Sequence, residues 1–229
     1  MTKAEYKSIE TYMLEQMQDA GHDRHHIYRV MNAALDIGEY ITDRGEKIDT
    51  DVLIAACLLH DIGREKQYAD KKIDHAYAGG QMAYDFLMGR KWPEDKANHV
   101  KECILSHRYR SDNPPQTIEA KILFDADKLD AAGAMGIARV LIYCGQVNEP
   151  LYILDEDGGI VFGGKKSASF VQEYNYKLKK LYDAFHTERA KELAAKVQKA
   201  SADFYEAIIE EISGSYESGK KRLGDLLRE

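Results

Sequence analysis

The chain has 229 residues, a length suited to one large domain or two small ones, and a fold of this size buries roughly 70% of the surface that the unfolded chain exposes. It is 44% hydrophobic and 31% charged, a balance that excludes disordered and fibrous proteins. The 39 acidic residues outnumber the 32 Lys and Arg residues and give a net charge of −7, which argues against duplex nucleic acid as a partner. An anionic small molecule stays compatible with this charge.

The cysteines and the apolar runs indicate the cellular compartment of the protein. Cys57, Cys103 and Cys144 are odd in number and contain no C-x-x-C pair, which fits neither a disulfide framework nor a thiolate metal site. The longest unbroken apolar run, Val52 to Leu59, is far shorter than the ~20 residues that a membrane span requires. The first residues also lack the apolar segment of a signal peptide. We expect a cytoplasmic protein without a membrane partner.

Apolar residues recur along the chain with the period of an α-helix. From Ile27 to Ile41 they fall at every third or fourth position, which predicts an amphipathic helix that ends near Gly45. No run of residues alternates in the way that a strand requires. The expected fold class is therefore all-α, a single helical bundle. Further helices are predicted over about 3–20, 50–62, 75–89, 94–109, 117–142 and 170–213.

A long Gly-rich segment, about 145–169, is predicted to be non-helical. It could cover a site or be a plain surface loop, and a short β-hairpin around Asp157 is possible. Ser169 and Gln172 have the capping-box spacing with which a helix restarts. The apolar stripe over 170–213 that follows is expected to pack on the core.

The helix predicted over 50–62 ends on two polar residues. Its residues up to Leu59 are apolar on every face, which places it in the centre of the fold, and His60 and Asp61 follow directly. Burying an imidazole and a carboxylate is costly unless something pairs with them. A metal ion beside the helix would compensate for this cost, and so would a His–Asp pair that caps the helix end. Both interpretations are open at this point.

Two other segments carry similar side chains. His26 lies near the core-facing side of its helix, where a core histidine with a hydrogen-bond partner is the ordinary alternative. Asp125, Asp127 and Asp130 fall in an otherwise apolar segment, and Asp127 and Asp130 share a helix face. A solvated acidic face is the alternative, but the Ala and Gly residues that follow favour close helix packing.

Together, His26, His60-Asp61 and Asp127 resemble the H...HD...D signature of the HD-domain metal-dependent phosphohydrolase superfamily. The resemblance implies that His26, His60, Asp61 and Asp127 bind a divalent ion. The chemistry agrees, because two imidazoles and two carboxylates favour Mn²⁺, Fe²⁺, Co²⁺, Ni²⁺ or Zn²⁺ and leave about two octahedral positions open. An ion with open positions suits the hydrolysis of a phosphate ester or anhydride.

Two longer segments resemble the bacterial YedJ/YpgQ-like subfamily. Residues 22–30 match H-D-x-x-H-x-x-R-V, and residues 119–139 match E-A-K-I-x-x-D-A-D-x-L-[DE]-A-x-G-A-x-G-[IL]-A-R. The similarity extends over about 15–212. It implies one HD domain over 1–229, with a core of about 15–142, the loop at about 145–169 and C-terminal helices at about 170–213 packed on the core.

Further residues are candidates for binding the substrate. Some HD-domain proteins hold a second metal with two additional histidines, and His75 and His107 could do this or bind a phosphate as protonated donors. We expect phosphate binding by these two histidines. Many cations lie in the motif segments, and Arg64, Lys121 and Lys128 are predicted to bind phosphate as well.

The general base is left open by the sequence. Glu65 and Asp130 are candidates to orient or deprotonate the attacking water, whereas Arg64 stands where several HD nucleotidases have a carboxylate. The remaining histidines lie among polar neighbours and are expected to be ordinary surface residues. They are His22, His25, His99 and His186.

The resemblance favours a nucleotide pyrophosphohydrolase, which converts an NTP or dNTP to the monophosphate and pyrophosphate. A phosphomonoesterase or a cyclic-nucleotide phosphodiesterase would use the same ligand set. A metal-binding module that senses a nucleotide without turnover is the alternative of another class. The expected partners are one divalent transition metal, with a second one possible, and a nucleotide or another phosphorylated small molecule.

Overall fold

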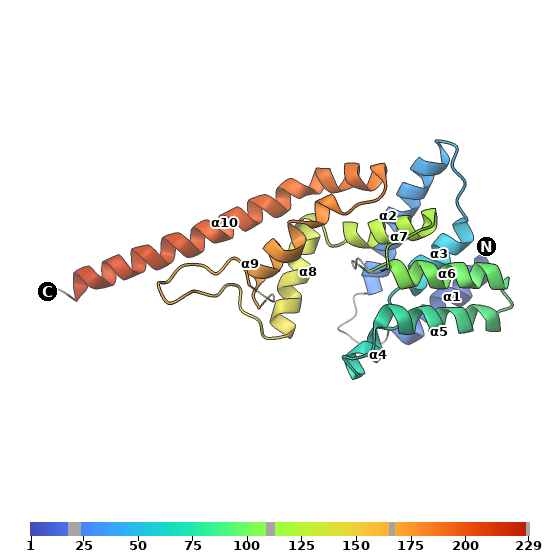
Figure 1. Ribbon diagram of the computed structural model, residues 1–229, viewed down its shortest axis with the longest axis horizontal. Coiled ribbons are helices and arrows are strands. Elements are labelled where there is room, and N and C mark those ends of the chain that lie inside the picture. Colours follow the sequence, from blue (N-terminus) through green and yellow to red (C-terminus); the bar gives the residue numbers. More distant parts are fainter. Residues whose placement is uncertain (18–23, 109–112, 165–167, 228–229) are drawn as a thin grey trace. The chain divides into compact units, whose positions relative to one another are not determined.

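The computed structural model describes residues 1–17, 24–108, 113–164 and 168–227 (Figure 1). Within these residues every regular element is a helix, so the predicted all-α class is confirmed. Contacts divide the chain into two compact units, Met1–Asp130 with Phe185–Ala190, and Ala131–Ala184 with Lys191–Glu229. Each unit is described by itself, and the single domain expected over 1–229 stays a prediction.

The first unit is built around one apolar helix. It contains α1 (Lys3–Gln16), α2 (Arg24–Thr42), α3 (Thr50–Leu59), α4 (Arg64–Ala69), α5 (His75–Gly89), α6 (Glu94–Ser106) and α7 (Ile118–Leu129). The apolar α3 is almost entirely buried and contacts α1, α2, α5, α6 and α7, which agrees with its predicted central place. Helices α5 and α6 lie side by side (Figure 1).

Polar side chains determine where four of these helices begin. Thr2 and Glu5 form a capping box at the start of α1. Asp49, Asp74 and Thr117 accept hydrogen bonds from first-turn N–H groups of α3, α5 and α7. The cap at Asp74 makes His75 the first residue of α5.

The turn after α3 passes very close to the start of α5. A Cβ atom at Gly63 would lie 2.2 Å from the carbonyl oxygen of His75 and 2.6 Å from the backbone N of Gly79. Both neighbours are backbone atoms that cannot move aside like a flexible side chain, so only glycine fits at this position. This close approach brings His60 and Asp61 next to His75.

The second unit has a smaller core. Its elements are α8 (Gly133–Gln146), α9 (Phe170–Glu173), a π-helix (Tyr174–Leu178), a 3₁₀-helix (Leu181–Asp183) and most of α10 (Glu188–Leu226). A buried cluster includes Ile137 and Cys144 of α8 with Phe170 and Tyr174. The ring of Tyr174 also stacks on Tyr205 of α10, with centroids 3.9 Å apart.

Two predicted helices are broken in the structure. The one expected over 117–142 is divided into α7 and α8, because Gly133 has a left-handed φ of +60° and the carbonyl oxygen of Ala131 approaches Gly136 closely. The one expected over 170–213 is interrupted by the π- and 3₁₀-helices, and α10 continues to Leu226. The predictions for residues 18–20 and 109 lie outside the described residues.

The Gly-rich segment contains a tight turn. Leu154 and Ile160 form an isolated antiparallel bridge, and Gly158 has a φ of +86°. Asp155 accepts hydrogen bonds from the backbone N of Asp157 and of Gly159. The possible hairpin around Asp157 is thus confirmed as a single bridge. None of the described helices is both long enough and apolar enough to cross a membrane.

Candidate metal centre

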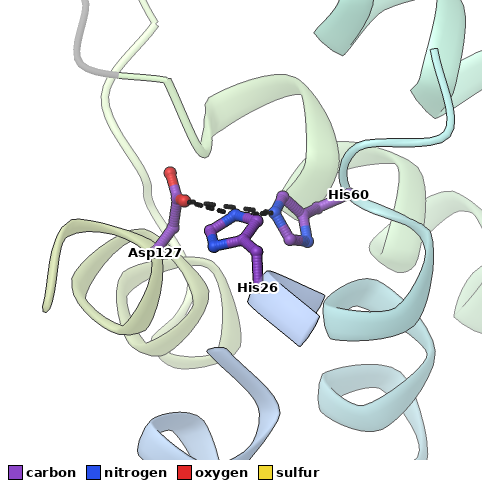
Figure 2. A group of neighbouring side chains, drawn as sticks. All are labelled: His26, His60 and Asp127. Atoms are coloured by element: carbon purple, nitrogen blue, oxygen red, sulfur yellow. Dashed lines mark hydrogen bonds and ion pairs between the residues drawn. The ribbon is translucent and has the colours of Figure 1, made fainter. Parts of the chain in front are cut away.

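A first group of metal-binding side chains comes from three helices of the first unit. His26 of α2, His60 after α3 and Asp127 of α7 converge, as Figure 2 shows. The Nε2 atom of His26 lies 3.2 Å from Nε2 of His60 and 3.2 Å from Oδ1 of Asp127. The structure therefore brings together three of the four predicted ligands around one point.

Asp61 lies between this group and a second one. Its Oδ2 atom lies 3.7 Å from Nε2 of both His26 and His60. Its Oδ1 atom lies 3.6 Å from Nε2 of His75 and 3.7 Å from Nε2 of His107. The ligand atoms of Asp61, His75 and His107 all lie within 4.8 Å of one another, a spacing that could hold a metal ion. One carboxylate thus faces two sets of imidazoles.

Helix ends supply several of these residues. His60, His107 and Asp130 are the C-cap residues of α3, α6 and α7. Because the C-terminal end of a helix carries partial negative charge, three such ends favour a cation. The local geometry at His60 is repeated at His107, since each ring bonds through Nδ1 to the carbonyl oxygen three residues earlier.

The hydrogen bonds of the four histidines determine which ring nitrogen faces the centre. Each ring bonds through Nδ1 to an oxygen at 2.5–2.9 Å, and its Nε2 atom points at the other ligands. In a neutral ring a donor at Nδ1 leaves a lone pair on Nε2, which is the usual arrangement of metal-binding histidines. The acceptors are the carbonyl oxygens of Cys57 and Ile104 for His60 and His107, Oε1 of Gln67 for His75, and Oδ2 of Asp130 for His26.

The residues of the centre are shielded from solvent. His26, His60, Asp61, His75 and His107 are buried, and Asp127 is partly buried. The Nε2 atom of His75 has no hydrogen-bond partner within the part of the chain that the structure describes. An unpartnered buried lone pair is costly unless a cation uses it. The donor set and its burial therefore fit a divalent metal ion.

Three carboxylates of the centre each contact a cationic side chain. Because the formal charges of the three pairs cancel, a divalent ion would give the centre an excess of positive charge. The contacts are Arg64 Nε with Asp61 Oδ1 at 2.9 Å, Lys128 Nζ with Asp127 Oδ2 at 2.7 Å, and the Arg29 guanidinium with both oxygens of Asp130.

These contacts also shift pKa values. Burial raises the pKa of Asp61, but Arg64 and the histidines outweigh it and hold the pKa well below its usual range. Burial alone would lower the pKa of His26, but its hydrogen bonds to Asp127 and Asp130 raise it to about 9. Burial lowers the pKa of His60 to about 4, and burial with the charge of Arg64 lowers that of His75 to about 2. His60 and His75 are therefore neutral, as metal ligands must be.

The remaining candidates occupy different places. Asp130 lies on the far side of the His26 ring, where both its oxygens accept hydrogen bonds, so its position suits holding His26 rather than deprotonating a water. Lys128 is buried and donates to Asp127 and to the carbonyl oxygen of His107, which leaves it little freedom to reach a phosphate. Glu65 is exposed at the start of α4, and Lys121 is half-buried on α7.

The neutral state of His75 bears on its expected role. A neutral imidazole with a lone pair on Nε2 cannot donate a hydrogen bond to phosphate from that atom. The environment of His75 thus favours the alternative that the sequence left open, a ligand of a cation, over the protonated phosphate donor.

The sequence did not predict some of the contacts that support the centre and the fold around it. Gln67 orients His75, and no sequence signal pointed to it because the contact depends on how α4 and α5 pack. Asp125 belongs to the acidic segment but is fully buried, and it accepts hydrogen bonds from His186 N, Thr187 N and Thr187 Oγ1. It therefore anchors the residues before α10.

The histidines outside the centre differ from one another. His25 and His186 are exposed, as predicted. His99 is less exposed than these two: its ring is partly buried, hydrogen bonds to Thr117 and lies 3.3 Å from Glu119. His22 lies outside the described residues.

Comparisons with known proteins agree with this centre. Residues 24–132 match the HD domain model, a range that contains both groups of ligands. The chain is 29% identical to the Bacillus subtilis protein YpgQ over 197 residues, which cover 86% of this chain and 87% of the relative.

The chain is also similar in structure to solved proteins. The crystal structure of a Lactobacillus plantarum protein has 27% identity and a TM-score of 0.72, covering 93% of this chain and 99% of the other. The complex of YpgQ with ADP has 27% identity and a TM-score of 0.69, with 91% and 98% covered. An HD-superfamily hydrolase from Bacillus thuringiensis has 27% identity and a TM-score of 0.67, with 91% and 97% covered. The chain thus contains an HD domain at residues 24–132 and resembles YpgQ and HD-superfamily hydrolases over most of its length.

Proposed function

We propose that the protein is a metal-dependent phosphohydrolase that converts a nucleoside or deoxynucleoside triphosphate to the monophosphate and pyrophosphate. The observation that carries the proposal is the convergence of His26, His60, Asp61 and Asp127 through Nε2 and carboxylate oxygens. YpgQ, which the chain resembles, was crystallised with ADP, and this supports a nucleotide as the ligand.

The four residues would hold one divalent transition-metal ion. Neutral imidazole nitrogens and ionised carboxylates are the donors that such ions prefer, and the Nδ1 hydrogen bonds keep each Nε2 directed at the ion. When bound, such an ion lowers the pKa of a water and polarises a phosphoryl oxygen.

The charge of the centre favours an anionic substrate. The contacts of Arg64, Lys128 and Arg29 already neutralise Asp61, Asp127 and Asp130. A bound divalent ion therefore leaves an excess of positive charge that the phosphates of a nucleotide would complement. A neutral substrate would leave this charge uncompensated.

Other side chains have supporting tasks. Asp130 holds the His26 ring in place, and Arg29 fixes Asp130 in turn. The side chain of Arg64 is 34% exposed, so it can reach a phosphate at the edge of the centre. Glu65, exposed on the next residue, is our candidate for orienting the attacking water, and Lys121 stays a candidate for phosphate binding.

The test is a screen of nucleotides against Mn²⁺, Co²⁺ and Ni²⁺, with products identified by mass. We expect pyrophosphate and a nucleoside monophosphate. Orthophosphate would instead indicate a phosphomonoesterase, and a linear monophosphate from a cyclic nucleotide would indicate a phosphodiesterase. Stabilisation by nucleotides without any product would support the sensing module and overturn the proposal.

Two histidine variants give the controls. His60→Ala removes a buried ligand, and we expect its metal affinity to fall by more than about 100-fold, since even the loss of a residue that only supports a ligand costs about 10–100-fold. Activity should fall with it. His186→Ala removes an exposed ring and keeps the backbone N–H that bonds to Asp125, so both metal binding and activity should persist.

A further inference from the structure

Arg64 occupies the carboxylate oxygen that a second ion would need. Its Nε atom lies 2.9 Å from Oδ1 of Asp61. The same oxygen lies 3.6 Å from Nε2 of His75 and 3.7 Å from Nε2 of His107. A guanidinium and two imidazoles therefore share one oxygen atom, while the other oxygen of Asp61 faces His26 and His60.

The two histidines of this group both direct Nε2 at Asp61. Nδ1 of His107 bonds to the carbonyl oxygen of Ile104 and Nδ1 of His75 bonds to Oε1 of Gln67, so both Nε2 atoms point inward. The unpartnered Nε2 atom of His75 and Oδ1 of Asp61 are both acceptors, and such an arrangement is unfavourable without a positive charge nearby. Arg64 supplies a positive charge in direct contact with this oxygen of Asp61.

Charge and space make Arg64 and a second ion mutually exclusive. Nε of Arg64 lies 2.9 Å from Oδ1 of Asp61, so an ion bound to the same oxygen would be next to the guanidinium. Two positive charges this close repel each other strongly in a buried site. Because Arg29, Arg64 and Lys128 already neutralise the three carboxylates, one divalent ion at the first group gives the centre a net positive charge. A second ion therefore becomes favourable only when Arg64 leaves the centre, which its partly exposed side chain would permit.

We infer that Arg64 takes the place of a second cation at Asp61, so that the chain binds one divalent ion and not two. The inference rests on the proposed function only in that the first group must bind an ion. It makes Arg64 the residue that determines the metal stoichiometry of the centre, and it explains why a complete set of ligands at Asp61, His75 and His107 is compatible with a single ion.

The test counts ions in the full chain. Wild-type protein and variants are dialysed against Mn²⁺, and bound manganese is measured per chain by mass spectrometry. We expect one ion in the wild type and two in Arg64→Gln, which removes the charge but keeps a polar side chain. Spin coupling between the two ions, seen by electron paramagnetic resonance, should appear in this variant alone.

Three further variants make the count specific. Arg64→Lys keeps the positive charge and should bind one ion. The double variant Arg64→Gln/His75→Ala loses a ligand of the second group and should return to one. Arg189→Gln breaks a similar arginine–aspartate contact, with Asp36 in the same unit, and should keep one ion.

The number of bound ions in each variant supports or overturns the inference. One ion in both the wild type and Arg64→Gln overturns the role of Arg64 and leaves the proposed function intact. Two ions in the wild type overturn it as well. A wild type that binds no ion contradicts the metal site and with it the proposed function. If Arg64→Gln is unfolded by circular dichroism, Arg64→Met gives the same count.

Discussion

The carboxylate of Asp130 accepts a hydrogen bond from Nδ1 of His26 at 2.7 Å, and this contact determines which nitrogen of His26 faces Asp127. The two residues are 104 positions apart in the chain. The same carboxylate is held by the guanidinium of Arg29, so the buried Asp130 and the partly exposed Arg29 together fix the His26 ring. A carboxylate behind a histidine raises its basicity as a ligand and fixes its orientation.

Asp130→Asn should weaken metal binding without unfolding the protein. The amide keeps the shape of the carboxylate but loses the charge that holds Arg29 and His26, so we expect a loss of metal affinity of about 10–100-fold. Isothermal titration with Mn²⁺ measures the affinity, and thermal unfolding without metal checks the fold. Asp36→Asn, which breaks the contact with Arg189 instead, is the matched control and should leave affinity unchanged. Equal affinity in both variants would contradict a positioning role for Asp130.

Gly63→Ala should destabilise the first unit. Its Cβ would collide with the backbone of His75 and Gly79, and forced overpacking of this kind costs about 1–3 kcal/mol. Gly89→Ala is the matched control, because a Cβ there meets nothing within 4 Å and alanine is the better helix former. Chemical denaturation of the metal-free protein compares the two variants. A free energy of unfolding that is equal for Gly63→Ala and the wild type would rule out the proposed close contact as a constraint.

Metal affinity should rise with pH. Below its pKa of about 9 the ring of His26 is protonated in the metal-free protein, so an ion must displace a proton. The apparent affinity should then increase by about tenfold per pH unit between pH 6 and pH 8 and level off as the pH passes the pKa. Titrations in buffers of different ionisation enthalpy should detect about one proton released per ion near pH 7. An affinity that is constant or falls over this range would show that His26 is neutral before the ion binds.

Much of the fold follows from local patterns in the chain. The apolar period predicts α2, and the uninterrupted apolar residues of α3 predict its central place, because such a surface must be covered on every side. The end of α3 then delivers His60 and Asp61 to the interior, and their pattern with His26 and Asp127 predicts the ligands that the structure brings together.

Helix breaks were harder to predict. Residues near Ala131 and Gly133 continue the helical pattern, and α7 ends because of a backbone conformation that only the packing of this turn reveals. The division of 170–213 arises in the same way, since the π-helix interrupts a stripe whose apolar spacing is intact. Periodicity records which face is buried and not whether the backbone stays continuous.

The sequence by itself determined the helical class, the central apolar helix and the residue types of the metal centre. Only the tertiary structure decided that Asp130 supports His26, that Gln67 orients His75 and that Arg64 lies on Asp61. The physical reason is that residue type and spacing specify which groups are buried, whereas the direction of each lone pair depends on contacts between helices that are distant in the chain.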